Sequence, residues 1–170
     1  MARDAAADFV ESQLLGDAAG VLDVADVARI NPPSGDDQWR CLARAIYFEA
    51  RGEPIAGQVA VAEVILNRVD SPRYPDTVCA VVMQGADRPT GCQFSFNCDG
   101  KPNTVRDKRA YGLAGRIAHV MLAGRPRTLT GAATHFHTRN VNPSWARRLV
   151  RITRIGAHIF YRYPIMTASN

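Results

Sequence analysis

Glutamate occurs at only four positions of this chain, so the search for a catalytic carboxyl is short: Glu11, Glu49, Glu53 and Glu63. Glu49 follows Ile46 by three residues in segment 38–51, whose apolar residues recur at helical spacing, so it lies on or beside the apolar face. Its place near the end of that helix adds an unfavourable dipole to the effect of burial, and both raise a carboxyl pKa. Glu49 therefore has the properties of a general acid, the alternative being a core-edge glutamate bonded to an arginine such as Arg51.

The two neighbouring glutamates are expected to be structural. Glu53 follows the turn at Gly52 and begins the next helix, where an ionised first-turn acid is stabilised by the helix dipole. Glu63 lies in the middle of that second helix, so an ion pair with Arg44 or Arg68 is the expected role.

Two histidines, His135 and His137, are spaced so that both point to one face of a strand. With a glutamate they could bind zinc, but no third ligand lies at a motif spacing and no H-E-x-x-H sequence is present. We therefore expect no metal and no cofactor, and we assign the histidines to contacts with a sugar or peptide.

The four cysteines allow two disulfides in three possible connectivities. Cys92 and Cys98 are close enough in a glycine-containing loop to pair, and Cys41 and Cys79 would then bridge two helices. The alternative is four buried free thiols, and the residues alone leave both possibilities open.

The helices and strands that must position these residues can be predicted from the spacing of apolar residues, which changes along the chain. Helical spacing precedes segments rich in β-branched and aromatic residues, which favours an α+β fold. Residues 85–104 form a long irregular stretch, of a kind that is often functional. Helices are expected over 38–51, 54–69, 76–84 and 105–123, and strands over 93–96, 133–138, 150–155 and 158–163.

Length and composition favour a single domain, since the chain has 170 residues and 22% charged residues. The breaker cluster Asn31–Asp37 divides an acidic N-terminal tail or linker, 1–37, from a domain over 38–170.

No apolar run is long enough to span a membrane. The first residues lack the pattern of a signal peptide, so the protein is either cytosolic or exported with its signal removed.

Charge is distributed unevenly. Residues 1–40 carry eight acids and three bases, whereas eleven bases and no acid follow Asp107. Such a basic half indicates an anionic partner, which could be nucleic acid, acidic lipid or a cell-wall polymer, although a solvated basic surface explains it equally well.

Several sequence blocks together resemble the SleB/CwlJ-type cell wall hydrolase family. The most specific is Glu-Ala-Arg-Gly-Glu-Pro at 49–54, with Asn-Arg-Val at 67–69, and the resemblance extends over roughly residues 40–162. The other blocks include Cys-Gln-Phe-Ser at 92–95, His-Phe-His at 135–137, Pro-Ser-Trp-Ala at 143–146 and Ile-Gly-Ala-His-Ile-Phe-Tyr at 155–161.

The resemblance implies cleavage of the MurNAc–GlcNAc bond of peptidoglycan by a lysozyme-like, lytic transglycosylase-like helical domain with a small antiparallel sheet. Its catalytic glutamate corresponds to Glu49, and one carboxyl suffices if the product is a 1,6-anhydro-MurNAc end. The resemblance also implies disulfides among Cys41, Cys79, Cys92 and Cys98, and a periplasmic or otherwise exported protein. The expected substrate contacts are Tyr47, Glu53, Gln93, Phe94, Ser95, Phe136, His137 and Trp145.

The expected partner is a peptidoglycan glycan strand. We expect the protein to be a monomer that neither inserts stably into a membrane nor binds nucleic acid. Three alternatives remain open: a muramidase that adds water, a non-catalytic wall-binding module, and a nucleic-acid binder suggested by the basic half. For the aromatic residues, and for Trp145 in particular, core packing is the alternative to sugar contact.

Overall fold

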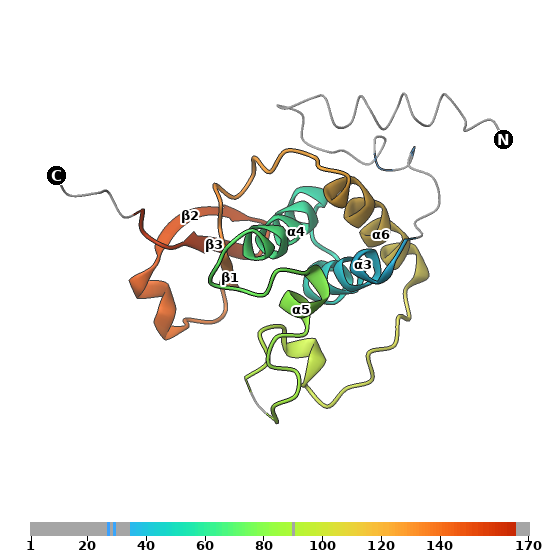
Figure 1. The fold of residues 1–170 in the computed structure, drawn as a ribbon, viewed down its shortest axis with the longest axis horizontal. Helices are drawn as coiled ribbons and strands as arrows, with labels where there is room; N and C mark the ends of the chain where they lie inside the picture. Colours follow the sequence, from blue (N-terminus) through green and yellow to red (C-terminus); the bar gives the residue numbers. More distant parts are fainter. Residues whose placement is uncertain (1–26, 28, 30–34, 90, 166–170) are drawn as a thin grey trace.

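The computed structural model describes residues 27, 29, 35–89 and 91–165 of the chain. Within these residues, helices surround a central helix and a small sheet lies to one side (Figure 1). The elements are α3 (Asp37–Ala50), α4 (Ile55–Val69), α5 (Val78–Val82), η1 (Ser95–Asn97), α6 (Lys108–Leu122), β1 (His135–Thr138), η2 (Ser144–Arg148), β2 (Val150–Ile155) and β3 (His158–Arg162). The expected α+β fold is confirmed, with helices first and strands last.

Helix α4 is the centre of the molecule. It is apolar on nearly all sides, as a helix enclosed by other elements must be, and its residues from Gly57 to Leu66 are all buried. It contacts α3, α5 and α6 as well as the strands β1 and β2. Any residue of α4 that is not apolar is therefore placed inside the protein, where it needs a partner.

The sheet has the order β1-β3-β2, and both pairs of strands are antiparallel. Residues 135–138 pair with 158–161, and an irregularity between Arg151 and Thr153 interrupts the pairing of β2 with β3. Phe136 and Phe160 turn one face of the sheet towards the buried core. The two histidines of β1 consequently lie on its other face.

The expected strand at 93–96 is wrong. Phe94 and Phe96 are buried in the core and Gln93 and Ser95 are exposed, but Ser95–Asn97 form a 3-10 turn. The side-chain amide of Asn97 donates to the carbonyl oxygen of Val82, which ties this turn to the end of α5. The alternating sequence thus reflects alternating burial along a loop, without a neighbouring strand.

The expected ion pair of Glu63 is also wrong. Its carboxylate accepts hydrogen bonds from the backbone N–H groups of Leu129 and Thr130 and from the Thr130 hydroxyl, at 2.7–3.1 Å. Arg44 instead donates to the carbonyl oxygen of Asn103, and Arg68 to that of Thr134. Glu63 therefore fastens the connection between α6 and β1 to the central helix.

Both disulfides join cysteine pairs that the sequence analysis considered. Cys41–Cys79 links α3 to α5, and Cys92–Cys98 closes a short loop that contains η1. The alternative of four free thiols is wrong. Cross-links of this kind stabilise a fold mainly by restricting the unfolded chain.

The proposed division at residue 37 is only partly visible, because most of segment 1–37 lies outside the described residues. Helix α3 begins at that point, and the side chain of Asp36 caps it by accepting from the backbone N–H of Trp39. Val27 is 1% exposed and packs in the main hydrophobic cluster. Among the described residues, no helix has the length and apolar character that crossing a bilayer requires.

The disulfides are expected to differ in their effect on stability. The Cys41–Cys79 bond has a sequence separation of 38 and the Cys92–Cys98 bond a separation of 6. Loop-closure entropy then predicts a loss of about 4 kcal/mol in unfolding free energy for Cys41→Ser/Cys79→Ser, and about 2 kcal/mol for Cys92→Ser/Cys98→Ser. Urea unfolding of both double variants checks this order, and a larger loss from the shorter loop would contradict it.

Candidate active site

A cavity of about 250 Å³ opens where the end of α3, the middle of the 85–104 stretch and the sheet meet. Glu49 and Arg68 contribute from α3 and α4, and the other lining residues come from three segments of the second half of the chain. These residues are Cys92, Gln93, Phe94, Ser95, His135, Phe136, His137, Val141, Pro143 and Trp145. The structure thus brings together Glu49 and six of the eight expected substrate contacts, leaving out Tyr47 and Glu53.

Glu49 is the only carboxylic acid among the residues that line this cavity. It lies in the last turn of α3, partly buried, and burial raises its pKa from 4.5 to about 7. The positive charge of Arg68 acts in the opposite direction and keeps the pKa from rising further. A carboxyl with this pKa is protonated in a large fraction of molecules near neutral pH, as a general acid must be.

Arg51 does not take the role of a partner for Glu49. Its guanidinium lies over the ring of Tyr47, 4.8 Å from the ring centroid, and donates to the Tyr47 hydroxyl. The expected bond from Glu49 to Arg51 is therefore not formed.

Arg68 is a cavity residue that the sequence did not single out for this site. Its side chain is 3% exposed, and its guanidinium lies 5.1 Å from the ring centroid of Tyr74 and 5.4 Å from that of Phe94. Nε donates to the carbonyl oxygen of Thr134 over 2.7 Å. A buried arginine beside a raised-pKa acid could not be recognised from spacing, because Arg68 and Glu49 belong to different helices.

His135 and His137 face the same side of β1, as their spacing predicted, and both contact the ring of Trp145. Burial and the charge of Arg68 lower the pKa of His135 to about 4, so its ring is neutral near pH 7. His137 bonds through Nδ1 to the carbonyl oxygen of Thr138 and through Nε2 to the Tyr161 hydroxyl. These contacts hold the rings as one wall of the cavity.

The aromatic lining residues differ in exposure. Phe94 is 2% exposed and supports Arg68 from the core side. Trp145 is only partly buried, against His135, His137 and Tyr161. Trp145 is therefore the lining aromatic residue best placed to offer a ring to a ligand.

Tyr47 does not line the cavity, which corrects the expected sugar contact. It is 1% exposed, and its hydroxyl accepts hydrogen bonds from the backbone N–H groups of Arg106 and Asp107. These bonds, that of Asp107 first, lower the pKa of Tyr47. Its ring belongs to the core, and its hydroxyl anchors the segment before α6.

Glu53 lies outside the cavity lining as well, and its side chain does not cap α4, whose N-cap residue is Pro54. Its carboxylate instead accepts from the backbone N–H of Ala157, 3.2 Å away in the turn between β2 and β3. A Cβ atom on Gly156 would clash with that carboxylate, and Gly156 has a φ of +57°, so both the space and the backbone conformation require glycine.

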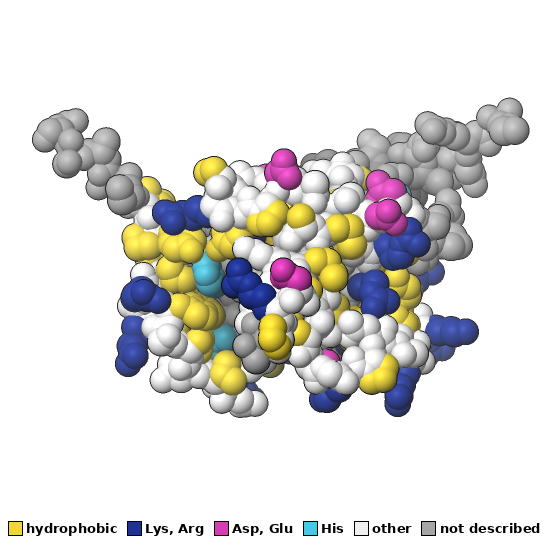
Figure 2. Space-filling view, turned by 60° about the horizontal axis from the view of Figure 1, so that its bottom comes forward, with side chains coloured by type: hydrophobic (Ala, Val, Ile, Leu, Met, Phe, Trp, Pro, Cys, Tyr) yellow, Lys and Arg dark blue, Asp and Glu magenta, His cyan; other side chains and the backbone are white. Residues whose placement is uncertain are grey.

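The surface around the cavity combines apolar and basic groups. Figure 2 shows histidine side chains on one face, beside hydrophobic side chains at a hollow between the sheet side and the helical side, with Lys and Arg side chains around it. Within the described residues, no cluster of three or more His, Cys, Asp or Glu side chains could hold a metal ion. The chemistry that this site offers is proton transfer by one carboxyl.

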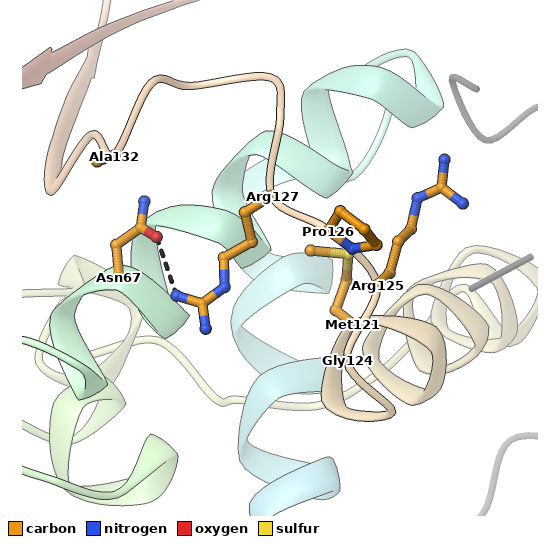
Figure 3. Close-up of a pocket in the computed structure, with 7 residues that line it drawn as sticks. All are labelled: Asn67, Met121, Gly124, Arg125, Pro126, Arg127 and Ala132. Atoms are coloured by element: carbon orange, nitrogen blue, oxygen red, sulfur yellow. Dashed lines mark hydrogen bonds between the residues drawn. The ribbon is translucent and has the colours of Figure 1, made fainter. Parts of the chain in front are cut away.

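A second cavity of about 340 Å³ lies between the end of α4 and the segment after α6, and it is larger but has no carboxyl or histidine in its lining. Arg127 donates to Asn67 across it, whereas the guanidinium of Arg125 points away (Figure 3). Arg127 also forms an ion pair with Asp70 at 2.6 Å, so its charge is already balanced. Size alone therefore does not identify the functional site.

Comparison with known proteins supplies an independent line of information. A family model described as Cell Wall Hydrolase matches residues 52–161. The spore cortex-lytic enzyme of Bacillus subtilis (strain 168) is 49% identical over 142 residues, which cover 79% of this chain and 41% of that protein. The corresponding enzyme of Halalkalibacterium halodurans is 37% identical over 132 residues, covering 76% and 37%.

Two solved structures are also similar. The catalytic domain of the germination-specific lytic transglycosylase SleB from Bacillus anthracis has a TM-score of 0.59 and 30% identity, covering 76% of this chain and 97% of that one. The catalytic domain of SleB from Bacillus cereus gives a TM-score of 0.59 and 32% identity, covering 78% and 96%. The chain therefore spans less than half the length of these curated relatives but nearly all of the solved catalytic domains.

Removal of the Glu49 carboxyl should change how stability depends on pH. The pKa of Glu49 is 4.5 ordinarily and about 7 in the folded protein. The folded protein binds the Glu49 proton more tightly than the unfolded chain does. The stabilisation that results is therefore complete below pH 4.5 and is lost as the pH rises through 7. Relative to Glu49→Gln, which does not titrate, the wild-type unfolding free energy should fall by up to about 3 kcal/mol over that range. Urea unfolding between about pH 4 and pH 8 measures this difference, and parallel stability curves would contradict the assignment.

Proposed function

Since the chain belongs to the cell wall hydrolase family, we propose that it cleaves peptidoglycan at the MurNAc–GlcNAc bond as a lytic transglycosylase. The observation that carries this proposal is the pKa of about 7 for the single carboxyl that lines the cavity. One of the similar solved domains is named as the catalytic domain of a lytic transglycosylase, which supports the same reaction class. We assign the activity to the domain over 38–170.

One carboxyl can serve both halves of this reaction. Protonated Glu49 donates its proton to the glycosidic oxygen, which keeps the electron pair of the bond that breaks. The N-acetyl group of the substrate stabilises the cation at the sugar carbon. The 6-hydroxyl oxygen of the same sugar then bonds to that carbon, and the Glu49 carboxylate takes up the hydroxyl proton. The products are a 1,6-anhydro-MurNAc end and a free hydroxyl on the neighbouring sugar, with Glu49 protonated again.

The remaining lining residues suit a bound glycan strand. Gln93 and Ser95 are exposed polar residues at the rim, and His137 presents a ring already oriented by two hydrogen bonds. Trp145 offers a ring for a sugar face, and Phe136 lines the cavity from β1 while its ring packs against Phe160 on the core side. We propose that these five residues contact the substrate, together with the buried Phe94 at the floor of the cavity.

The two disulfides support a protein that acts outside the reducing cytosol. We propose that the enzyme is exported to the periplasm or to the wall, acts there as a monomer, and binds neither nucleic acid nor membrane stably. The basic residues that follow Asp107 then face a wall polymer with carboxylate groups on its peptides.

Glu49→Gln should abolish turnover while the fold is kept. Loss of the only acid in the cavity is expected to lower the rate by about 10³-fold, measured as release of soluble fragments from purified sacculi. Asp37→Asn is the matched control, because it removes one carboxyl from the same helix at its exposed first turn, where Asp37 pairs with Arg40. That variant should leave turnover nearly unchanged.

Mass spectrometry of the released fragments identifies the reaction. Anhydro ends support transglycosylation, whereas reducing ends would show that water is the acceptor and that the enzyme is a muramidase. Retained activity in Glu49→Gln would overturn the assignment of the acid. Binding to sacculi without release of any fragment by the wild type would instead indicate a wall-binding module.

Trp145→Ala should weaken substrate binding more than chemistry. Loss of one aromatic contact of about 1 kcal/mol predicts a KM roughly fivefold higher with kcat little changed. Steady-state kinetics on solubilised glycan strands measure both constants. Trp39→Phe is the control, because Trp39 packs beside α6 and donates to the carbonyl oxygen of Gly115, away from the cavity. Equal effects of the two substitutions would contradict a role for Trp145 in binding.

A further inference from the structure

Arg68 has a hydrogen-bonding capacity that the fold does not use. Nε donates to Thr134, and the guanidinium lies against the rings of Tyr74 and Phe94. Nη1, however, is buried and has no hydrogen-bond partner among the described residues. An unpaired buried donor is costly, and a charged one especially so. This unpaired donor belongs to a residue that lines the same cavity as Glu49, and this position indicates a function there.

The surroundings of Arg68 favour a role beside Glu49. Both side chains line the same cavity, and each is influenced electrostatically by the charge of the other. Burial lowers the pKa of Arg68, yet a guanidinium remains charged in proteins. The Glu49 carboxylate that forms during the reaction would thus appear next to a fixed positive charge in a poorly solvated place, where such a charge acts strongly.

We propose that Arg68 is a positioning residue that stabilises the Glu49 carboxylate formed when the acid has given up its proton. This inference rests on the proposed function for its catalytic meaning. Arg68 keeps its own protons throughout, and its buried Nη1 has no hydrogen-bond partner among the described residues that would compete for its charge. Arg68 thereby lowers the cost of the acid step and holds Glu49 ready to act as the base in the next one.

The other titratable groups around Glu49 do not supply this charge. From β1 the cavity receives His135 and His137, and the pKa of about 4 leaves His135 neutral near pH 7. The lining residues of segments 92–95 and 141–145 carry no charge. The Coulombic influence of Tyr74 and Tyr163 raises the pKa of Arg68, and neither tyrosine supplies a positive charge. Among the described groups that line the cavity, only Arg68 carries a permanent positive charge.

The test is a direct titration of the Glu49 carboxyl by ¹³C NMR in the full chain, in wild type and in Arg68→Gln, Arg68→Met and Arg68→Lys. Loss of the positive charge should move the midpoint for Glu49 to a pH about one unit higher in the Gln and Met variants. The Lys variant, which can retain the charge, should lie closer to wild type. Circular dichroism identifies the variants that fold.

Turnover provides the second measurement. The Gln and Met variants should lose kcat by about tenfold or more with KM little changed, and the alkaline limb of their pH–rate profile should move upward with the NMR midpoint. An unchanged midpoint in a folded charge-free variant would overturn the proposal. So would failure of all three variants to fold, since Arg68 would then be required by the fold itself. Because the NMR midpoint does not depend on turnover, it tests Arg68 even if the proposed reaction is wrong.

Discussion

Burial of one carboxyl at the end of a helix is the constraint that the rest of the structure serves. Glu49 is far enough from water for its pKa to rise to about 7, yet the proposed reaction requires it to reach a substrate. The structure meets both conditions by ending α3 at Ala50, directly after the acid, and by closing the space around it with segments from later in the chain. The opposing charge of Arg68 limits how far the pKa can rise.

The central helix holds this arrangement in place. Because α4 is enclosed on nearly all sides, its polar residues act as fixed attachment points inside the protein. Glu63 holds the backbone at 129–130, Asn67 donates to Ala133, and Arg68 donates to Thr134. The approach to β1 is therefore fastened at successive residues, and the histidines that follow are placed with little freedom.

Local pattern was sufficient to predict the helices α3 and α4, the three C-terminal strands, and the common face of His135 and His137. It also placed Glu49 at a buried helix end, because helical spacing and helix-end position act within one segment. It failed where a role depends on residues distant in sequence. The partners of Glu63 and Arg68 come from the segment before β1, and the buried side chains of the 93–96 loop pack in the main core. Tyr47 lies in that core and not in the cavity, a difference that spacing along one helix does not reveal.

The contact between Glu53 and the turn of the β2–β3 hairpin limits how this chain can change. Two segments more than a hundred positions apart share one small volume, in which the acid side chain occupies the space that a Cβ on Gly156 would need. A smaller residue at 53 would free the space that a side chain at 156 needs, but the φ of +57° would still strain any residue other than glycine there. Insertion into the hairpin turn would separate Ala157 from its acceptor, so engineering of this chain should leave Gly156 unchanged and vary Glu53 only together with the turn that it holds.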